Sequence, residues 1–131
     1  MRIAAVVGES GSGKTTLVVA LIRYFVARGE RVAAIKHTHH PLNLERRGDT
    51  AAFESAGASP VILAGNREAV IFTHDDARTI VFDAPGDLLA HVDAGIVLVE
   101  GFKNFHGWPQ ISPLKLEDAL DNLSRIWRTK T

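Results

Sequence analysis

The sequence predicts an α/β fold with a doubly wound, mostly parallel sheet, and three observations support that prediction. Residues 3–7 form an unbroken apolar run, which is typical of a parallel strand buried on both faces. After a glycine-rich turn, apolar side chains recur at helical spacing as far as Gly29, which ends the expected helix. A second apolar strand is expected over 31–35, so the opening favours one right-handed crossover unit of a parallel sheet.

The turn after the first strand, GESGSGKT over 8–15, matches the phosphate-binding pattern G-x-x-x-x-G-K-[ST] at every position. Its glycines allow consecutive backbone N–H groups to point at one anion, and the next helix adds partial positive charge. We expect Lys14 to contact phosphate as the catalytic residue and the Thr15 hydroxyl to bind Mg²⁺. A glycine-rich turn without a ligand is the alternative, which the strand-to-helix context disfavours.

The motif therefore indicates a P-loop NTPase. The expected nucleotide-binding residues are consecutive in the chain: Gly8, Glu9, Ser10, Gly11, Ser12, Gly13, Lys14, Thr15 and Thr16.

The composition excludes several classes of protein. The 131 residues carry 15 lysines and arginines against 15 aspartates and glutamates, so the strongest sign of a nucleic-acid binder is missing. No cysteine is present, which excludes disulfides, thiolate zinc sites and cysteine nucleophiles. Neither a secretory signal pattern nor an apolar run of about 20 residues occurs. We expect one P-loop nucleotide-binding domain over 1–131, in a soluble cytoplasmic protein that binds neither nucleic acid nor membrane.

Residues 36–48 lack helical or strand periodicity and predict a long loop with three histidines and the basic pair Arg46 and Arg47. Loops at the carboxyl edge of a parallel sheet line the ligand crevice, so this segment is a candidate for the site. Asp49 is the expected N-cap of a short helix over 50–56.

The second half of the chain predicts shorter elements. Residues 60–64 and 69–73 are expected to pair as an antiparallel hairpin. The clearest late strand covers 95–99 and is followed at once by Glu100. The remaining expected elements are a strand over 79–82, a short helix over 86–92, an edge strand over 108–113 and a helix over 117–127.

A phosphate-binding loop of this kind also needs an acid at the end of a neighbouring strand to hold Mg²⁺. Two residues compete for this role, Asp83 and Glu100. Asp83 is favoured by residue type, since its turn looks like the switch turn of many GTPases. Glu100 follows the more apolar strand and precedes Gly101, which permits close approach to a nucleotide. The residues by themselves leave both acids open.

Four segments together resemble the molybdopterin-guanine dinucleotide biosynthesis adaptor protein B (MobB) family. They are GESGSGKTTL at 8–17, IKHTHH at 35–40, GDT at 48–50 before AGA at 56–58, and LVEGFK at 98–103. The resemblance implies a protein that binds GTP with Mg²⁺, hydrolyses it weakly and assists addition of a guanine nucleotide to the molybdenum cofactor's pterin. The implied partners are molybdopterin guanylyltransferase and molybdoenzyme maturation proteins, and a homodimer is expected.

The resemblance also implies site residues. It favours Glu100 over Asp83 as the metal acid and adds Asp49 to Thr15 and Glu100 as a metal candidate. It places five further residues at the nucleotide- or pterin-facing edge: Lys36, His37, His39, Gly101 and Lys103.

The chain departs from the family pattern in three respects. The helix after Asp49 has no arginine before AGA, and the last helix follows Pro113 almost directly, whereas family members are usually longer. No Asn-Lys-x-Asp segment is present to select guanine, so the preference for guanine comes from the resemblance alone.

Several alternatives remain at this stage. The histidines of 36–40 are expected to contact phosphate or pterin oxygens, to hold a transition metal, or to lie in a solvated loop without a task. A small-molecule kinase is an alternative function, with only Arg46 and Arg47 available as lid arginines. The other alternative function is a binding partner that does not hydrolyse nucleotide to any relevant extent, or whose nucleotide site is vestigial.

Overall fold

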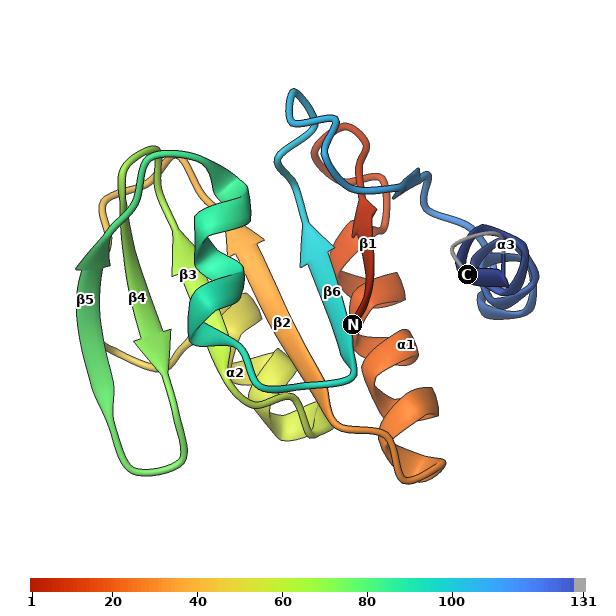
Figure 1. Cartoon of the computed structure of the whole chain (residues 1–131), viewed down its shortest axis with the longest axis horizontal. Helices are drawn as coiled ribbons and strands as arrows, with labels where there is room; N and C mark the ends of the chain where they lie inside the picture. The colour runs from red at the N-terminus through yellow and green to blue at the C-terminus, as the bar shows by residue number, and fades with distance from the viewer. Residues whose placement is uncertain (129–131) are drawn as a thin grey trace.

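The computed structural model describes residues 1–128, and within them seven strands form one sheet in the order β5-β4-β3-β2-β6-β1-β7 (Figure 1). Five strands run parallel: β3 (Val61–Ala64), β2 (Val32–His37), β6 (Ile96–Glu100), β1 (Arg2–Val6) and β7 (Gln110–Ile111). The last two, β4 (Glu68–Phe72) and β5 (Ala77–Val81), each run antiparallel to their neighbours. The mostly parallel sheet with an antiparallel hairpin is therefore confirmed.

Helices cover both faces of this sheet. Figure 1 shows α1 (Lys14–Ala27) and α2 (Gly48–Ala56) behind the sheet, and the 3₁₀ helix η1 (Pro85–His91) in front of it. The last helix, α3 (Leu116–Arg128), stands beside the β7 edge.

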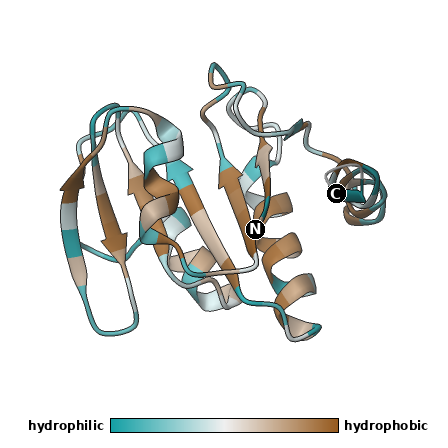
Figure 2. Ribbon diagram, in the orientation of Figure 1, coloured by the Kyte–Doolittle hydropathy of each residue, from teal (hydrophilic) through white to brown (hydrophobic). Residues whose placement is uncertain are grey.

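The core forms two apolar clusters, one on each face of the sheet. Because side chains alternate along a strand, Leu98 of β6 joins the cluster under α1 while Val97 and Val99 join the cluster under η1. Figure 2 shows mostly hydrophobic residues in β6 and α1, whereas the edge strand β5 carries both hydrophilic and hydrophobic ones. Both faces of the central strands are thus buried, as the apolar runs predict.

One predicted loop begins too early. Lys36 and His37 continue β2, where they pair with Leu63 and Ala64 of β3, and Lys36 also pairs with Glu100 of β6. Backbone pairing with β3 and β6 at Lys36, and with β3 at His37, keeps these two polar residues extended, although their side chains carry no strand signal. The loop therefore starts at Thr38.

The predicted N-cap at Asp49 is also wrong. Helix α2 begins at Gly48 with Arg47 as its N-cap, and that cap makes no side-chain hydrogen bond. Asp49 lies in the first turn, and its carboxylate bonds Lys36 instead. An ion pair with a half-buried lysine replaces the capping bond.

The other elements lie close to their predicted positions. The short helix over 85–91 is 3₁₀ helical, with the Asp87 carboxylate accepting from the Ala84 amide at 2.9 Å, and the edge strand shrinks to 110–111. Within the part of the chain that the structure describes, no helix has the length and apolar character that a membrane span requires.

Candidate phosphate-binding site

The glycine-rich loop between β1 and α1 is open to solvent. Gly11 and Gly13 have φ angles of 78° and 97°, in the left-handed region where a side chain would be strained. A β-carbon added at Gly11 would meet no atom within 4 Å. Backbone conformation rather than packing therefore requires glycine at Gly11, whereas a β-carbon added at Gly8 would lie 2.8 Å from the Ser12 hydroxyl and 3.1 Å from the Pro113 ring.

The loop holds its shape through its own bonds and leaves its later amides free. The Ser12 hydroxyl and amide both donate to the Glu9 carbonyl, at 2.6 and 3.2 Å. Leu17 is the first helical residue whose amide donates to the loop, at 3.0 Å from the Gly13 carbonyl. Among the described residues, the amides of 13–16 donate to no protein acceptor, as the first turn of a helix leaves them. These donors are available to an anion.

Lys14 lies over the start of the loop. Its Nζ donates to the Gly8 carbonyl at 2.9 Å, so the ammonium group reaches back across the cradle. Lys14 and the residues that carry the free amides line one hollow, which is the arrangement that the motif predicts.

Four side chains from four elements meet beside the cradle. The Thr15 hydroxyl on α1 donates to Glu100 Oε1 at 2.6 Å and lies 3.2 Å from Asp49 Oδ2 on α2. Lys36 Nζ from β2 contacts Asp49 Oδ2 at 2.6 Å and also binds Glu100 Oε2. The strand order explains why these side chains meet. Strand β6 lies between β1 and β2, and the register pairs Glu100 with Lys36 of β2 on one side and with Val6, the last residue of β1 before the loop, on the other.

The charges in this cluster stabilise one another. Burial lowers the Lys36 pKa, but hydrogen bonds to Asp49 and Glu100 and their negative charges raise it more, leaving it above its ordinary value of 10.5. Lys36 is therefore an ammonium ion at neutral pH. Glu100 is 2% exposed, and a carboxylate so deeply buried needs such partners.

The donor set suits Mg²⁺. A hydroxyl and two carboxylates offer the hard oxygen ligands that this ion prefers, on side chains that already face one another. Lys36 holds the same two carboxylates, so a divalent cation would compete with its ammonium group for them.

The structure separates the two candidate acids. Glu100 touches Thr15, whereas the Asp83 side chain is 90% exposed and pairs with Arg67 at 3.3 Å. Of the two acids, only Glu100 contacts the Thr15 hydroxyl at the phosphate-binding loop.

His37 lies on the other side of the sheet from Lys36. Its ring stacks on Phe102 at 4.1 Å between centroids and 9° between planes, and it meets His39 edge-on at 4.7 Å. Burial lowers the His37 pKa, the hydrogen bond that its ring donates to Asn66 Oδ1 opposes this, and the neighbouring His39 lowers the pKa further. The net shift is downward, so the His37 ring is neutral at pH 7.

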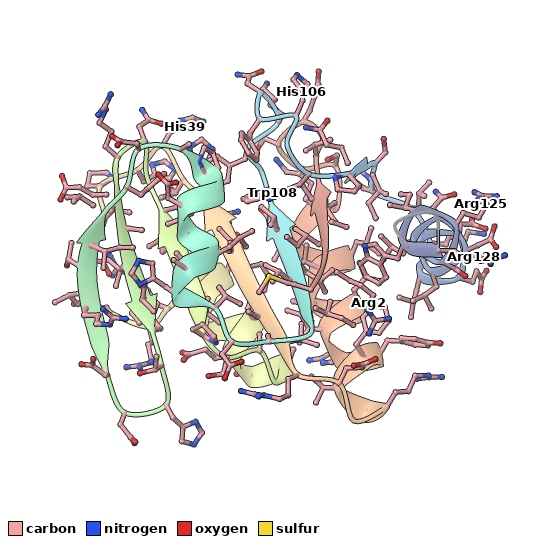
Figure 3. All side chains as sticks on the ribbon, viewed as in Figure 1. Arg2, His39, His106, Trp108, Arg125 and Arg128 are labelled. Atoms are coloured by element: carbon pink, nitrogen blue, oxygen red, sulfur yellow. The ribbon has the colours of Figure 1, made fainter. Side chains whose placement is uncertain are left out.

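The remaining edge residues surround the same opening. His37, His39, Gly101 and Lys103 line a cavity that reaches Gly8 and Lys14. Figure 3 shows His39 at the edge of the sheet where the loop carrying His106 also stands. Within residues 1–128, no group of three or more histidine, cysteine, aspartate or glutamate side chains is placed to hold a metal. The transition-metal interpretation of the histidines gains no support.

Arg46 is not placed as a lid over the cradle. Its guanidinium lies 5.2 Å from the centre of the Phe72 ring, donates to the Asp76 carbonyl at 2.7 Å and pairs with Glu54 at 3.1 Å. Arg47 is exposed and pairs with Glu45 at 3.3 Å. Both arginines proposed for a kinase lid are therefore engaged elsewhere.

Sequence reasoning missed three residues at this edge, Asn66, Phe102 and Phe105. Phe102 and Phe105 line the cavity beside Lys14, and Asn66 faces His37. The available signal was an aromatic residue directly after Gly101, at the end of a buried strand.

The sequence model described as "MobB: Molybdopterin guanine dinucleotide synthesis protein B" matches residues 3–123. The chain belongs to the MobB family. A family relative from Haemophilus influenzae, called a molybdopterin-guanine dinucleotide biosynthesis adapter protein, is 38% identical over 102 residues, covering 77% of this chain and 57% of the relative. A putative adapter protein of the same description from Methanocaldococcus jannaschii is 32% identical over 126 residues, covering 92% and 50%. The chain spans about half the length of these MobB relatives.

Solved MobB structures share the fold. The crystal structure of Bacillus subtilis MobB matches with a TM-score of 0.54 at 20% identity, covering 93% of this chain and 73% of that chain. At this identity the match supports the α/β fold class, which is confirmed, and nothing finer.

Proposed function

We propose that residues 1–131 form one P-loop domain that binds GTP with Mg²⁺, hydrolyses it slowly and acts as an adaptor in molybdopterin guanine dinucleotide biosynthesis. The observation that carries the proposal is the open cradle of free amides beside the Thr15–Glu100 pair. The adaptor role and the preference for guanine come from the family and from the names of its relatives.

In this proposal each group of the cradle has a separate task. The amides of 13–16 bind phosphate oxygens, and Lys14 swings from the Gly8 carbonyl to neutralise charge on the transferring phosphoryl group. Thr15, Glu100 and Asp49 would hold Mg²⁺, which would supply positive charge to the bound phosphates. Lys36 orients both carboxylates.

Slow hydrolysis is consistent with the hydrogen bonds and ion pairs that already occupy the nearby carboxylates. Asp49 and Glu100 both bind Lys36 and Thr15, so neither carboxylate is free to take a proton from an attacking water. A partner that supplies a water-orienting or cationic group would accelerate the reaction. The proposed partners are molybdopterin guanylyltransferase and molybdoenzyme maturation proteins, with the chain acting as a homodimer.

Calorimetry with GTP and ATP, each with and without Mg²⁺, tests the proposal. We expect binding of GTP that strengthens with Mg²⁺, and Lys14→Ala should weaken triphosphate binding by at least about tenfold while hardly affecting guanosine. Lys115→Ala, an exposed lysine before α3, is the matched control. No heat with either nucleotide, or equal loss of GTP and guanosine in Lys14→Ala, would contradict the proposal.

A further inference from the structure

A second hollow adjoins the phosphate cradle. It has a volume of about 810 Å³ and extends from Gly8 and Lys14 to a wall made by Pro85, Phe102 and Phe105. We call it the aromatic pocket. The hollow around Thr15, Asp49 and Glu100 is separate, at about 570 Å³. The two hollows adjoin each other, because Ser10, Lys14, His37 and His39 line both.

The aromatic pocket lies at the terminal-phosphate end of the cradle. In such loops the helix N-terminus binds the inner phosphates, while the lysine reaches the outer ones. Lys14 Nζ lies at the Gly8 carbonyl, and Gly8 lines the pocket, whereas Thr15 and Thr16 line only the other hollow. The nucleoside of a bound nucleotide would therefore leave the cradle away from this pocket.

The pocket wall presents rings held in fixed positions. Phe102 has a φ of 56°, a conformation that is unfavourable for a non-glycine residue and persists only when its surroundings impose it. Its ring stacks on His37 and meets Trp108 edge-on at 6.2 Å, while Phe105 meets Trp108 at 4.7 Å. Figure 3 shows Trp108 over the sheet beside β6. Such rings suit a flat aromatic ligand.

Charge around the pocket favours an anion. Lys103 lines it, together with Lys14, whose charge a bound nucleotide would share, and Glu9 is the one acid among its described lining residues. The amide side chains of Asn66 and Asn104 also line it, and they offer both donors and acceptors to the edge of a heterocycle. A neutral apolar ligand would leave these groups unused.

We infer that the aromatic pocket is a second ligand site, which takes a planar heteroaromatic compound bearing an anionic group. This ligand lies against the terminal phosphate of a nucleotide in the cradle, and both are bound at once. The inference rests on the proposed function for the position of the nucleotide and for the choice of a pterin as the probe.

The test measures the fluorescence of 6-hydroxymethylpterin monophosphate as the full chain is added, with Mg²⁺ and a non-hydrolysable GTP analogue present. We expect binding at least about tenfold tighter than that of 6-hydroxymethylpterin or of glycerol phosphate alone, because ring and anion contacts combine. Binding no tighter than that of either fragment would overturn the inference.

Two variants probe the wall and the charge separately. Phe105→Leu keeps apolar volume but removes the ring face, and it should weaken probe binding about two- to tenfold, while Phe105→Tyr restores it. Lys103→Ala should weaken the phosphorylated probe but not the unphosphorylated pterin, and Lys115→Ala should weaken neither. Thermal melting of each variant verifies folding. Unchanged probe binding in both Phe105→Leu and Lys103→Ala would show that the probe binds elsewhere.

Calorimetry of the same samples separates this inference from the proposed function. Nucleotide heat without probe binding overturns the second site and leaves the proposed function standing. Probe binding without nucleotide heat leaves the aromatic pocket as a ligand site, but it overturns the proposed function and with it the joint binding of probe and nucleotide. Release of the probe by nucleotide would show that the pocket holds part of the nucleotide itself, which overturns the inference.

Discussion

Glu100 illustrates how one residue can define a site. It is the most deeply buried charged side chain among the described residues, and it ends a strand whose other residues are all apolar. A carboxylate in this position would be costly without the Thr15 hydroxyl and the Lys36 ammonium that bind it. Glu100 is thus the one residue of β6 whose burial costs free energy, and it lies where a metal bound to phosphate would need a carboxylate.

Replacing the two candidate acids distinguishes their roles. Glu100→Gln should reduce the dependence of GTP binding on Mg²⁺, because the amide loses the charge that attracts the cation. Asp83→Asn should leave that dependence unchanged, since Asp83 lies in solvent beside Arg67. The measurement is calorimetric GTP affinity across a Mg²⁺ titration. The opposite pattern would assign the metal to Asp83.

Removing the Lys36 charge should expose a competition between ammonium and metal. Lys36→Met leaves Asp49 and Glu100 facing each other, and we expect a loss of about 1–3 kcal/mol in unfolding free energy, moderated by the partial exposure of Asp49. Added Mg²⁺ should recover more stability in the variant than in the parent, as thermal melting would show.

The matched control for this experiment is Arg31→Met, which removes a fully surface ion pair with Asp93. It should change stability by less than about 1 kcal/mol and respond to Mg²⁺ like the parent. If Mg²⁺ stabilised Lys36→Met no more than the parent, Lys36 and the metal would not share ligands.

At the scale of elements, the residues of β2 beside the end of β6 lie on opposite faces of the sheet. Alternation along β2 places Lys36 under the helices and His37 against Phe102. After Glu100 the backbone turns through two positive φ angles, 103° at Gly101 and 56° at Phe102. This turn connects the metal candidates to the aromatic pocket in three residues.

Gly101→Ala tests that turn. Alanine is strained at this φ, and its β-carbon would lie 2.9 Å from that of His37, so we expect a loss of about 2–4 kcal/mol in urea unfolding. Gly29→Ala is the control, because Gly29 has a φ of 83° but no atom within 4 Å of its added β-carbon. Equal losses in both variants would mean that the close approach to His37 contributes nothing.

At the scale of the whole molecule, α3 is tied to the same core that supports the cradle. Leu123 is buried in the cluster that contains Val6 and Leu17, the residues at the end of β1 and in the first turn of α1. The Trp127 indole donates to the Ile3 carbonyl at 3.0 Å, and its ring lies 5.7 Å from that of Phe25. The helix therefore braces both ends of the segment that holds the phosphate loop.

Leu123→Ala should lower the unfolding free energy by about 2–5 kcal/mol, since it opens a cavity in this shared core. Ser124→Ala, at an exposed neighbouring position, should change it by less than about 0.5 kcal/mol. Chemical denaturation followed by circular dichroism should show one transition in both variants. A separate early transition for α3 would contradict the proposal that the chain forms a single domain.

The sequence by itself determined the fold class and the phosphate loop. Both depend on patterns within short segments, the apolar strand of 3–7, the glycine-rich turn and the helical spacing after it, so neighbouring residues suffice to specify them. Tertiary structure decided how the site is completed. The sheet places β6 between β1 and β2, which brings Glu100 to Thr15 across 85 residues of chain and leaves Asp83 in solvent. Because strand order is set by packing of the whole sheet, the chemistry of the neighbouring residues leaves both acids open, and only the family resemblance that includes LVEGFK favours Glu100.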